Sequence, residues 1–135
     1  MIVELLEEAK KARKNAYAPY SDFAVGAALL CANGRIYKGC NIENCAYSPS
    51  VCAERVALFK AVSEGESSFT AIAIVGGSQE SDSLTSCYPC GVCRQVLAEF
   101  CEPSLQIITL DGEDIVETTL GELLPNAFTF EKNKD

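Results

Sequence analysis

The stretch TAIAIVGG at 70–77 constrains the fold of this chain more than any other segment. It is almost entirely apolar, and such a run is typical of a β-strand that is buried on both faces of a sheet. The run LQIITL at 105–110 has the same character. Because a sheet with two apolar faces needs helices on both sides, these strands predict a layered α/β protein.

The remaining segments supply those helices and further strands. Asn33-Gly34 separates two β-rich runs and predicts a two-residue hairpin turn. Thr119 and Glu122 have the spacing of a capping box at the start of a short last helix. The predicted helices are 2–16, 51–65, 89–101 and 119–124, and the two strands of the hairpin are 23–32 and 35–43.

This order of elements predicts a three-layer α/β/α fold around a central mixed sheet of about five strands. With 135 residues the chain fits a single domain, 1–135, that is large enough to bury a core. No apolar run approaches the roughly 20 residues of a membrane span. The charged N-terminal segment does not resemble a secretory signal, so we expect a cytoplasmic protein without a membrane partner.

The composition narrows the choice of partners and of chemistry. The net charge of −8 disfavours a nucleic acid polymer, which proteins bind through clusters of Lys and Arg. Eight cysteines without a secretory signal indicate metal binding or catalysis and not disulfides. The chain has no histidine, so thiolates and carboxylates must provide any transition-metal ligands and any proton transfer.

Three cysteines stand at predicted helix starts. Cys90 and Cys93 form a CxxC motif, and Cys52 opens the preceding predicted helix. In open α/β sheets ligands bind beyond the strand ends, near helix N-termini, where oriented N–H groups also lower the pKa of a thiol. Three thiolates hold one Zn²⁺ ion tetrahedrally with a fourth position for water, which is the arrangement of a catalytic site.

Two charged residues follow Cys52 directly. Glu54 stands on the first helical turn and can carry a proton from zinc-activated water to a substrate nitrogen; the alternative is a glutamate that only favours the helix dipole. Arg55 can offset the negative charge of three thiolates on one zinc ion; the alternative is an exposed arginine.

CAER at 52–55 followed by PCGVCRQVL at 89–97 resembles the small, homotetrameric, zinc-dependent cytidine deaminases. AYAPYSDFAVGAALL, GCNIEN and LLPNAF are similar to further blocks of that family, in order along the chain. The resemblance implies a hydrolase of pyrimidine salvage that converts cytidine and deoxycytidine to uridine and deoxyuridine, with release of ammonia. It makes Cys52, Cys90 and Cys93 the zinc ligands and Glu54 the proton shuttle.

The same resemblance implies a set of substrate contacts and a homotetramer whose sites are completed by neighbouring subunits. It places Phe23 against the pyrimidine ring, Asn41 and Glu43 at the ribose hydroxyls, backbone groups of Ala53 at the base, Phe128 in a neighbouring subunit's site, and Tyr20 and Tyr47 along the site or at subunit contacts. Without the resemblance, Phe23 and Phe128 fit core positions and Asn41 and Glu43 fit a turn.

Three rival interpretations remain. Cys87 in CYPCGVC can complete a closed four-thiolate zinc site, which would make the protein a non-catalytic scaffold. Cys90 and Cys93 can instead form a redox pair. A deaminase of a modified cytosine nucleoside such as blasticidin S is the nearest enzymatic alternative. Cys45 lies close to the expected site, and no argument from the sequence assigns it a role.

Overall fold

The computed structural model describes residues 1–130; the last five residues of the predicted domain, 131–135, lie outside the described part. The predicted helices and strands are present, with ends that shift by a few residues, and one further strand appears near the C-terminus. In chain order the elements are α1 (Ile2–Arg13), β1 (Phe23–Cys31), β2 (Ile36–Cys40), α2 (Ala53–Ser63), β3 (Phe69–Ser78), α3 (Gly91–Phe100), β4 (Gln106–Asp111), β5 (Asp114–Thr119) and α4 (Leu120–Leu123).

The strands form one mixed sheet with the order β2-β1-β3-β4-β5. β3 and β4 pair in parallel, and all other neighbouring strands pair antiparallel. The predicted strand at 70–77 is the central strand β3. The predicted mixed sheet of about five strands is therefore confirmed.

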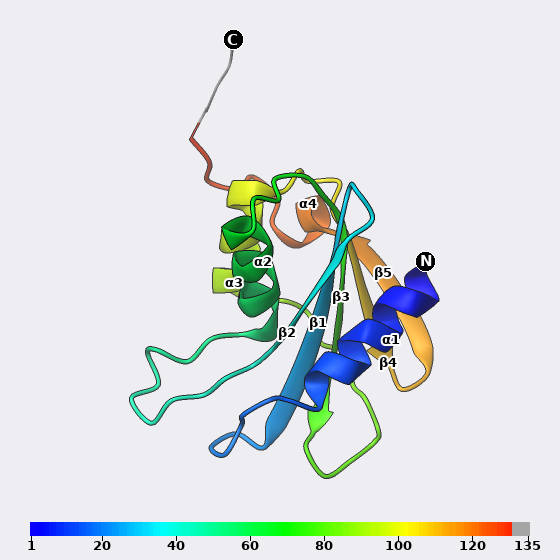
Figure 1. Ribbon diagram of the computed structural model, residues 1–135, viewed down its shortest axis with the longest axis vertical. Coiled ribbons are helices and arrows are strands. Elements are labelled where there is room, and N and C mark those ends of the chain that lie inside the picture. The colour runs from blue at the N-terminus through cyan, green and yellow to red at the C-terminus, as the bar shows by residue number, and fades with distance from the viewer. Residues whose placement is uncertain (131–135) are drawn as a thin grey trace.

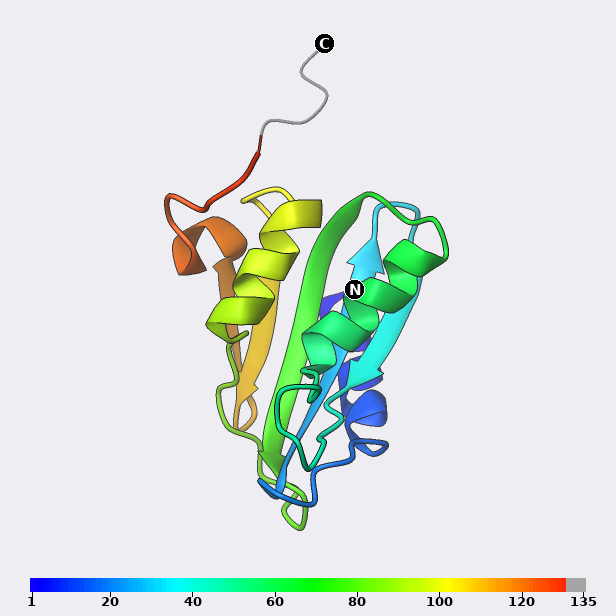
Figure 2. The ribbon, with the colours of Figure 1, turned by 90° about the vertical axis from the view of Figure 1, so that its left-hand side faces the viewer.

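Helices cover both faces of this sheet (Figures 1 and 2). Successive residues of β3 point to opposite faces: Ile72 and Ile74 belong to the core that α2 and α3 cover, whereas Ala73 and Val75 belong to the core under α1. The three-layer α/β/α fold is confirmed. Within residues 1–130, no helix is long and apolar enough to cross a membrane.

The β1–β2 hairpin is confirmed, but its turn is not the predicted two-residue type. Cys31 N donates to Arg35 O (2.9 Å), and Gly34 N donates to Cys31 O (3.0 Å). Gly34 has φ +92°, while Asn33 keeps a negative φ and accepts from Arg35 N (3.0 Å) through its side chain. The loop is the three-residue form with glycine in the left-handed position.

Strand β5 is the element that sequence reasoning missed. Asp111 pairs with Asp114 across a two-residue turn, in which Gly112 has φ +65°. The Asp-Gly dipeptide at 111–112 is a hairpin signal and could have revealed it. β5 is an edge strand rich in acidic residues and largely exposed, so its sequence lacks the apolar pattern of β3. The predicted cap of α4 is present, because Thr119 Oγ1 accepts from Glu122 N (3.3 Å).

A glycine on β2 determines how closely α2 approaches the sheet. A Cβ atom at Gly39 would lie 2.5 Å from Ala53 O and 2.5 Å from Ala57 N. Because such distances are well inside van der Waals contact, only glycine lets the first turn of α2 rest directly on β2. That first turn carries Ala53 and Glu54.

Candidate active site

The three predicted zinc ligands come together between the N-termini of α2 and α3. Cys52 is the N-cap of α2, Cys90 is the N-cap of α3, and Cys93 lies in the first turn of α3. Their Sγ atoms all lie within 4.8 Å of one another, and the Cys52–Cys90 Sγ separation is 3.8 Å. Among residues 1–130 this is the only group of three or more Cys, Asp or Glu side chains that could hold a metal ion.

The donor set fits zinc. A tetrahedral ion with Zn–S bonds of about 2.3 Å places two sulfurs about 3.8 Å apart, which agrees with the Cys52–Cys90 separation. Cys87 is not part of the cluster. The described residues therefore offer three thiolates, the number that leaves one tetrahedral position for water, and not the closed four-thiolate set of a structural zinc site.

Hydrogen bonds make one of these sulfurs a thiolate. The Cys93 thiol donates to Cys52, and with the Arg55 guanidinium it lowers the pKa of Cys52 to about 5 against the opposing effect of burial. Arg55 Nη2 lies 3.6 Å from Cys52 Sγ. The same donation raises the pKa of Cys93, with burial as the next cause. The structure thus brings Arg55 to the sulfur whose charge it was predicted to offset.

Glu54 lies inside the protein, with 4% of its surface exposed. Burial is the main cause that raises the pKa of this carboxyl group to about 7, and the negative charge of Cys52 acts in the same direction. A glutamate that only favoured the helix dipole would lose nothing by staying in water. A buried carboxyl group with a pKa near neutrality is suited to accept and release a proton.

Glu54 lines a cavity of about 220 Å³ between the start of α2, the residues after β2 and the segment before α3. Cys52, Ala53 and Cys90 share this cavity with Asn41 and Glu43. Val25 and Val51 supply apolar lining, and Cys87 and Tyr88 line the cavity from the segment before α3. The cavity is therefore lined by two of the three clustered cysteines and by both predicted ribose ligands.

Asn41 is held in place by the backbone of β1. Its Oδ1 accepts from Val25 N (2.8 Å), and its Nδ2 donates to Phe23 O (2.8 Å). These two bonds fix which end of the amide faces which way. They also join the predicted ribose ligand to the strand that carries Phe23.

Glu43 is fixed as firmly. Its Oε1 accepts from the backbone N–H groups of Tyr20 (3.0 Å) and Ser21 (3.2 Å), and its Oε2 accepts from Ser21 Oγ (2.5 Å). The Ser21 hydroxyl is the main cause of a lowered pKa, so the carboxylate is charged near neutral pH. Ser21 was not singled out from the sequence, because its role depends on a contact across 22 residues.

The predicted aromatic residues Phe23, Tyr20 and Tyr47 are not among the residues that line this cavity. The Phe23 ring packs over Gly76, where an added Cβ atom would lie 2.9 Å from Phe23 Cε2. Tyr20 and Tyr47 meet edge to face with ring centroids 6.2 Å apart, in an adjoining hollow that also contains Glu43.

Phe128, the predicted contact with a neighbouring subunit's site, lines neither the cavity nor the adjoining hollow of its own chain. Its side chain is 68% exposed, and its ring meets Phe130 edge to face with centroids 5.2 Å apart. Gln95 Nε2 on α3 donates to the carbonyl oxygen of Phe128 (2.7 Å). The C-terminal segment thus presents Phe128 to the surroundings and not to its own site.

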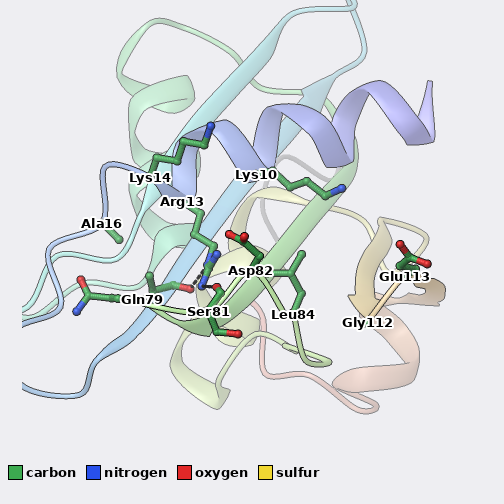
Figure 3. A pocket seen from close by; sticks show the side chains of 11 residues that line it. Lys10, Arg13, Lys14, Ala16, Gln79, Ser81, Asp82, Leu84, Gly112 and Glu113 are labelled. Atoms are coloured by element: carbon green, nitrogen blue, oxygen red, sulfur yellow. Dashed lines mark hydrogen bonds between the residues drawn. The ribbon is translucent and has the colours of Figure 1, made fainter.

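A second cavity, of about 470 Å³, lies beside the C-terminal end of α1 and has a different character (Figure 3). Arg13 points into it but is used to tie segments together: Nε donates to Ala24 O (2.9 Å), and Nη2 donates to Ser78 O (2.6 Å) and Ser81 O (3.3 Å). Its lining includes both basic and acidic side chains and no cysteine. The reactive groups are therefore in the smaller cavity.

Comparison with known proteins agrees with this geometry. A family model described as the cytidine and deoxycytidylate deaminase zinc-binding region matches residues 2–109. The chain belongs to this deaminase family. The matched region includes Cys52, Cys90 and Cys93, so the family's zinc-binding region coincides with the three-thiolate cluster.

Individual relatives match over almost the whole chain. A cytidine deaminase of Sporosarcina psychrophila is 54% identical over 131 residues, which cover 96% of this chain and 93% of that protein. A cytidine deaminase of Halalkalibacterium halodurans is 50% identical over 133 residues, covering 97% and 96%. The crystal structure of a cytidine deaminase from Burkholderia pseudomallei superposes with a TM-score of 0.83 at 45% identity, covering 93% and 98%.

A blasticidin-S deaminase of Bacillus cereus is also similar, but less so. It is 35% identical over 108 residues, which cover 78% of this chain and 76% of that protein. The higher identities belong to proteins named as cytidine deaminases. Among the enzymatic alternatives, similarity thus favours the unmodified nucleoside.

Proposed function

We propose that this protein catalyses the zinc-dependent hydrolytic deamination of cytidine and deoxycytidine in pyrimidine salvage. The observation that carries the proposal is the buried Glu54 carboxyl group, whose pKa is raised to about 7, in a cavity lined by two of the three converging thiols. A redox CxxC pair would need neither Glu54 nor Cys52. The relatives named as cytidine deaminases support the choice of substrate.

In the proposed mechanism Cys52, Cys90 and Cys93 hold the zinc ion. When bound there, zinc supplies a water molecule whose pKa is lowered toward about 7 and which can attack carbon C4 of cytosine. Glu54 accepts one proton from the attacking water and delivers it to ring nitrogen N3. It then accepts the second proton of that oxygen, now bonded to C4, and passes it to the amine, which leaves as ammonia. Arg55 donates to Cys52 Sγ and so limits the negative charge at the cluster.

Other residues position the nucleoside. We assign the ribose hydroxyls to Asn41 and Glu43, whose side chains are fixed by the backbone before any ligand arrives. Such preorganised polar groups discriminate strongly, because a ligand without the matching hydroxyls would leave them unpaired. Phe23 supplies a ring edge or face to the pyrimidine, Ala53 supplies backbone groups, and Tyr47 lies at the outer rim.

The direct test is to add cytidine to the zinc-loaded protein. Ammonia release together with the ultraviolet shift from cytidine to uridine is expected. Absence of both changes, at full zinc content and with a correctly folded protein, would overturn the proposed function.

The cavity is also expected to prefer nucleosides to nucleotides. The residues of this chain that line the cavity and its outer hollow include the acidic Glu43 and Glu54 and no Lys or Arg. A 5′-phosphate would meet carboxylates without a compensating cation. We expect kcat/KM for cytidine 5′-monophosphate to be lower than that for cytidine by a factor of about 100 or more. Equal values of kcat/KM in a steady-state assay would contradict this arrangement.

We further propose a homotetramer in which Phe128 enters the site of a neighbouring subunit. The support is its outward position at the end of the described chain, together with the family resemblance. Phe128→Ala is expected to raise KM for cytidine about 10-fold, since a buried aromatic contact at an interface contributes on that scale. The control is Ile115→Ala, which removes a different exposed apolar side chain, on β5, and is expected to leave KM unchanged.

The oligomer can be tested separately from the variant. Analytical ultracentrifugation is expected to show four chains, and the activity per chain is expected to fall on dilution below the dissociation range. A monomer with normal KM at high dilution would refute the shared site.

We also propose that the protein is cytoplasmic and that it forms a single domain. The eight cysteines are all free thiols, which fits the reducing cytoplasm. Both apolar cores pack on the same sheet, which supports one domain over 1–135.

A further inference from the structure

We propose that Cys87 determines which substituents the protein accepts at carbon C5 of the cytosine ring. The inference rests on the proposed function and concerns the wall of the cavity that the segment before α3 provides. Cys87 takes no part in the thiol cluster, yet it lines the same cavity.

The placement of the catalytic groups leaves one edge of the pyrimidine unassigned. The C4 end must face the thiol cluster, and the N1 end, which carries the ribose, must face Asn41 and Glu43. We assign the N3 and O2 edge to Glu54 and the backbone of Ala53, which line the cavity from the start of α2. The C5–C6 edge is then left to lining residues without an assigned role, which include Cys87 and Tyr88 in the segment before α3.

Contacts around Gly76 place the Cys87 thiol at this wall. A Cβ atom on Gly76 would lie 3.0 Å from Cys87 Sγ and 2.9 Å from Phe23 Cε2, so the thiol and the ring converge over the same glycine. Gly76 pairs with Val25, which also lines the cavity. The thiol therefore stands next to the ring that is assigned to the pyrimidine.

The wall cannot easily retreat. Cys87 N donates to Thr109 Oγ1 (3.1 Å), and Thr109 is fully buried on β4. The Cys87 side chain packs against the core between the sheet and the helices α2 and α3. Tyr88, by contrast, is 42% exposed, so it can move more freely at the rim. The space available at C5 is thus set by the Cys87 Sγ atom.

The expected result is a steep dependence on substituent size. One methylene group in a tight apolar pocket changes kcat/KM by roughly 10- to 200-fold. The wild-type protein is expected to deaminate 5-methylcytidine about 10-fold less efficiently than cytidine, and 5-ethylcytidine at least another 10-fold less efficiently. Methyl and ethyl groups are electronically alike, so a difference between them reports size.

The experiment compares kcat and KM for these three nucleosides in the wild type, Cys87→Ala and Cys87→Leu. In Cys87→Ala the ratio of kcat/KM for 5-methylcytidine to that for cytidine is expected to rise about 10-fold, mainly through KM. In Cys87→Leu the ratio is expected to fall. Cys101→Ala removes a partly buried cysteine at the other end of α3 and is expected to leave the ratio unchanged.

The outcomes separate this inference from the proposed function. Wild-type protein that does not deaminate cytidine overturns the function itself. Normal cytidine turnover with an unchanged ratio in Cys87→Ala overturns only the role of Cys87. If Cys87→Ala does not fold, the wild-type series decides, because equal kcat/KM for 5-methylcytidine and 5-ethylcytidine shows that no rigid wall faces C5.

Discussion

Glu54→Gln is expected to lower kcat for cytidine by roughly 10²- to 10⁴-fold, the usual contribution of a positioned general acid–base group. Glutamine keeps the size of the side chain and a hydrogen-bonding end, but it cannot accept and release the proton. Because the side chain is buried, the neutral amide is not expected to lower the melting temperature. The variant is expected to keep its zinc ion and its binding of cytidine. Steady-state kinetics, zinc analysis and calorimetric titration with cytidine measure turnover, zinc content and binding, and a thermal denaturation curve measures the melting temperature.

Glu64→Gln is the matched control for this variant. Glu64 is the C-cap of the same helix, α2, and is exposed outside the cavity. Its variant is expected to keep kcat within about twofold, since exposed substitutions away from a site have small effects. Near-normal turnover by Glu54→Gln, at unchanged zinc content, would remove Glu54 from the proton path.

The layered fold could be predicted because its central strands are recognisable from their local sequence alone. Strand β3 is apolar at almost every position, and this pattern arises only when helices cover both faces. The Asn33-Gly34 dipeptide located the hairpin, although the hydrogen bonds at Cys31 gave the loop one more residue than predicted. Strand β5 escaped prediction because an exposed edge strand does not need an apolar pattern.

The thiol cluster could be predicted for a different reason. Each of its cysteines stands at a helix start, and the spacing of Cys90 and Cys93 is itself a metal-ligand signal. The cavity wall before α3 carried no such signal. Cys87 could be recognised as unusual from the sequence, but its position over Gly76, together with the Phe23 ring, depends on the pairing of strands that are far apart in the chain.

The position of Phe128 could not be deduced from local pattern at all. The role proposed for its exposed ring depends on another subunit, and the resemblance to a family was the sole source for that role. Physical reasoning on one chain predicts what that chain buries. It predicts poorly what a chain leaves exposed for a partner.

Cys93→Ser is expected to remove most of the bound zinc and to lower turnover of cytidine by more than about 100-fold. Substitutions next to metal ligands already cost 10- to 100-fold in affinity, so loss of a ligand should cost more. Because metal binding adds to folding free energy, the melting temperature is expected to fall by roughly 5 °C or more. Zinc analysis and a thermal denaturation curve measure both effects.

Two other cysteine variants give this experiment its controls. Cys101→Ser, outside the cluster, is expected to keep one zinc ion per chain and normal kcat. Cys87→Ser tests the four-thiolate alternative. If zinc has only the three predicted thiolate ligands, this variant is expected to keep one zinc ion per chain. X-ray absorption of the wild type is then expected to show three sulfurs and one lighter ligand around zinc. Four sulfurs around zinc, together with zinc loss in Cys87→Ser, would make the centre a closed structural site and would remove the position at which water must bind for deamination.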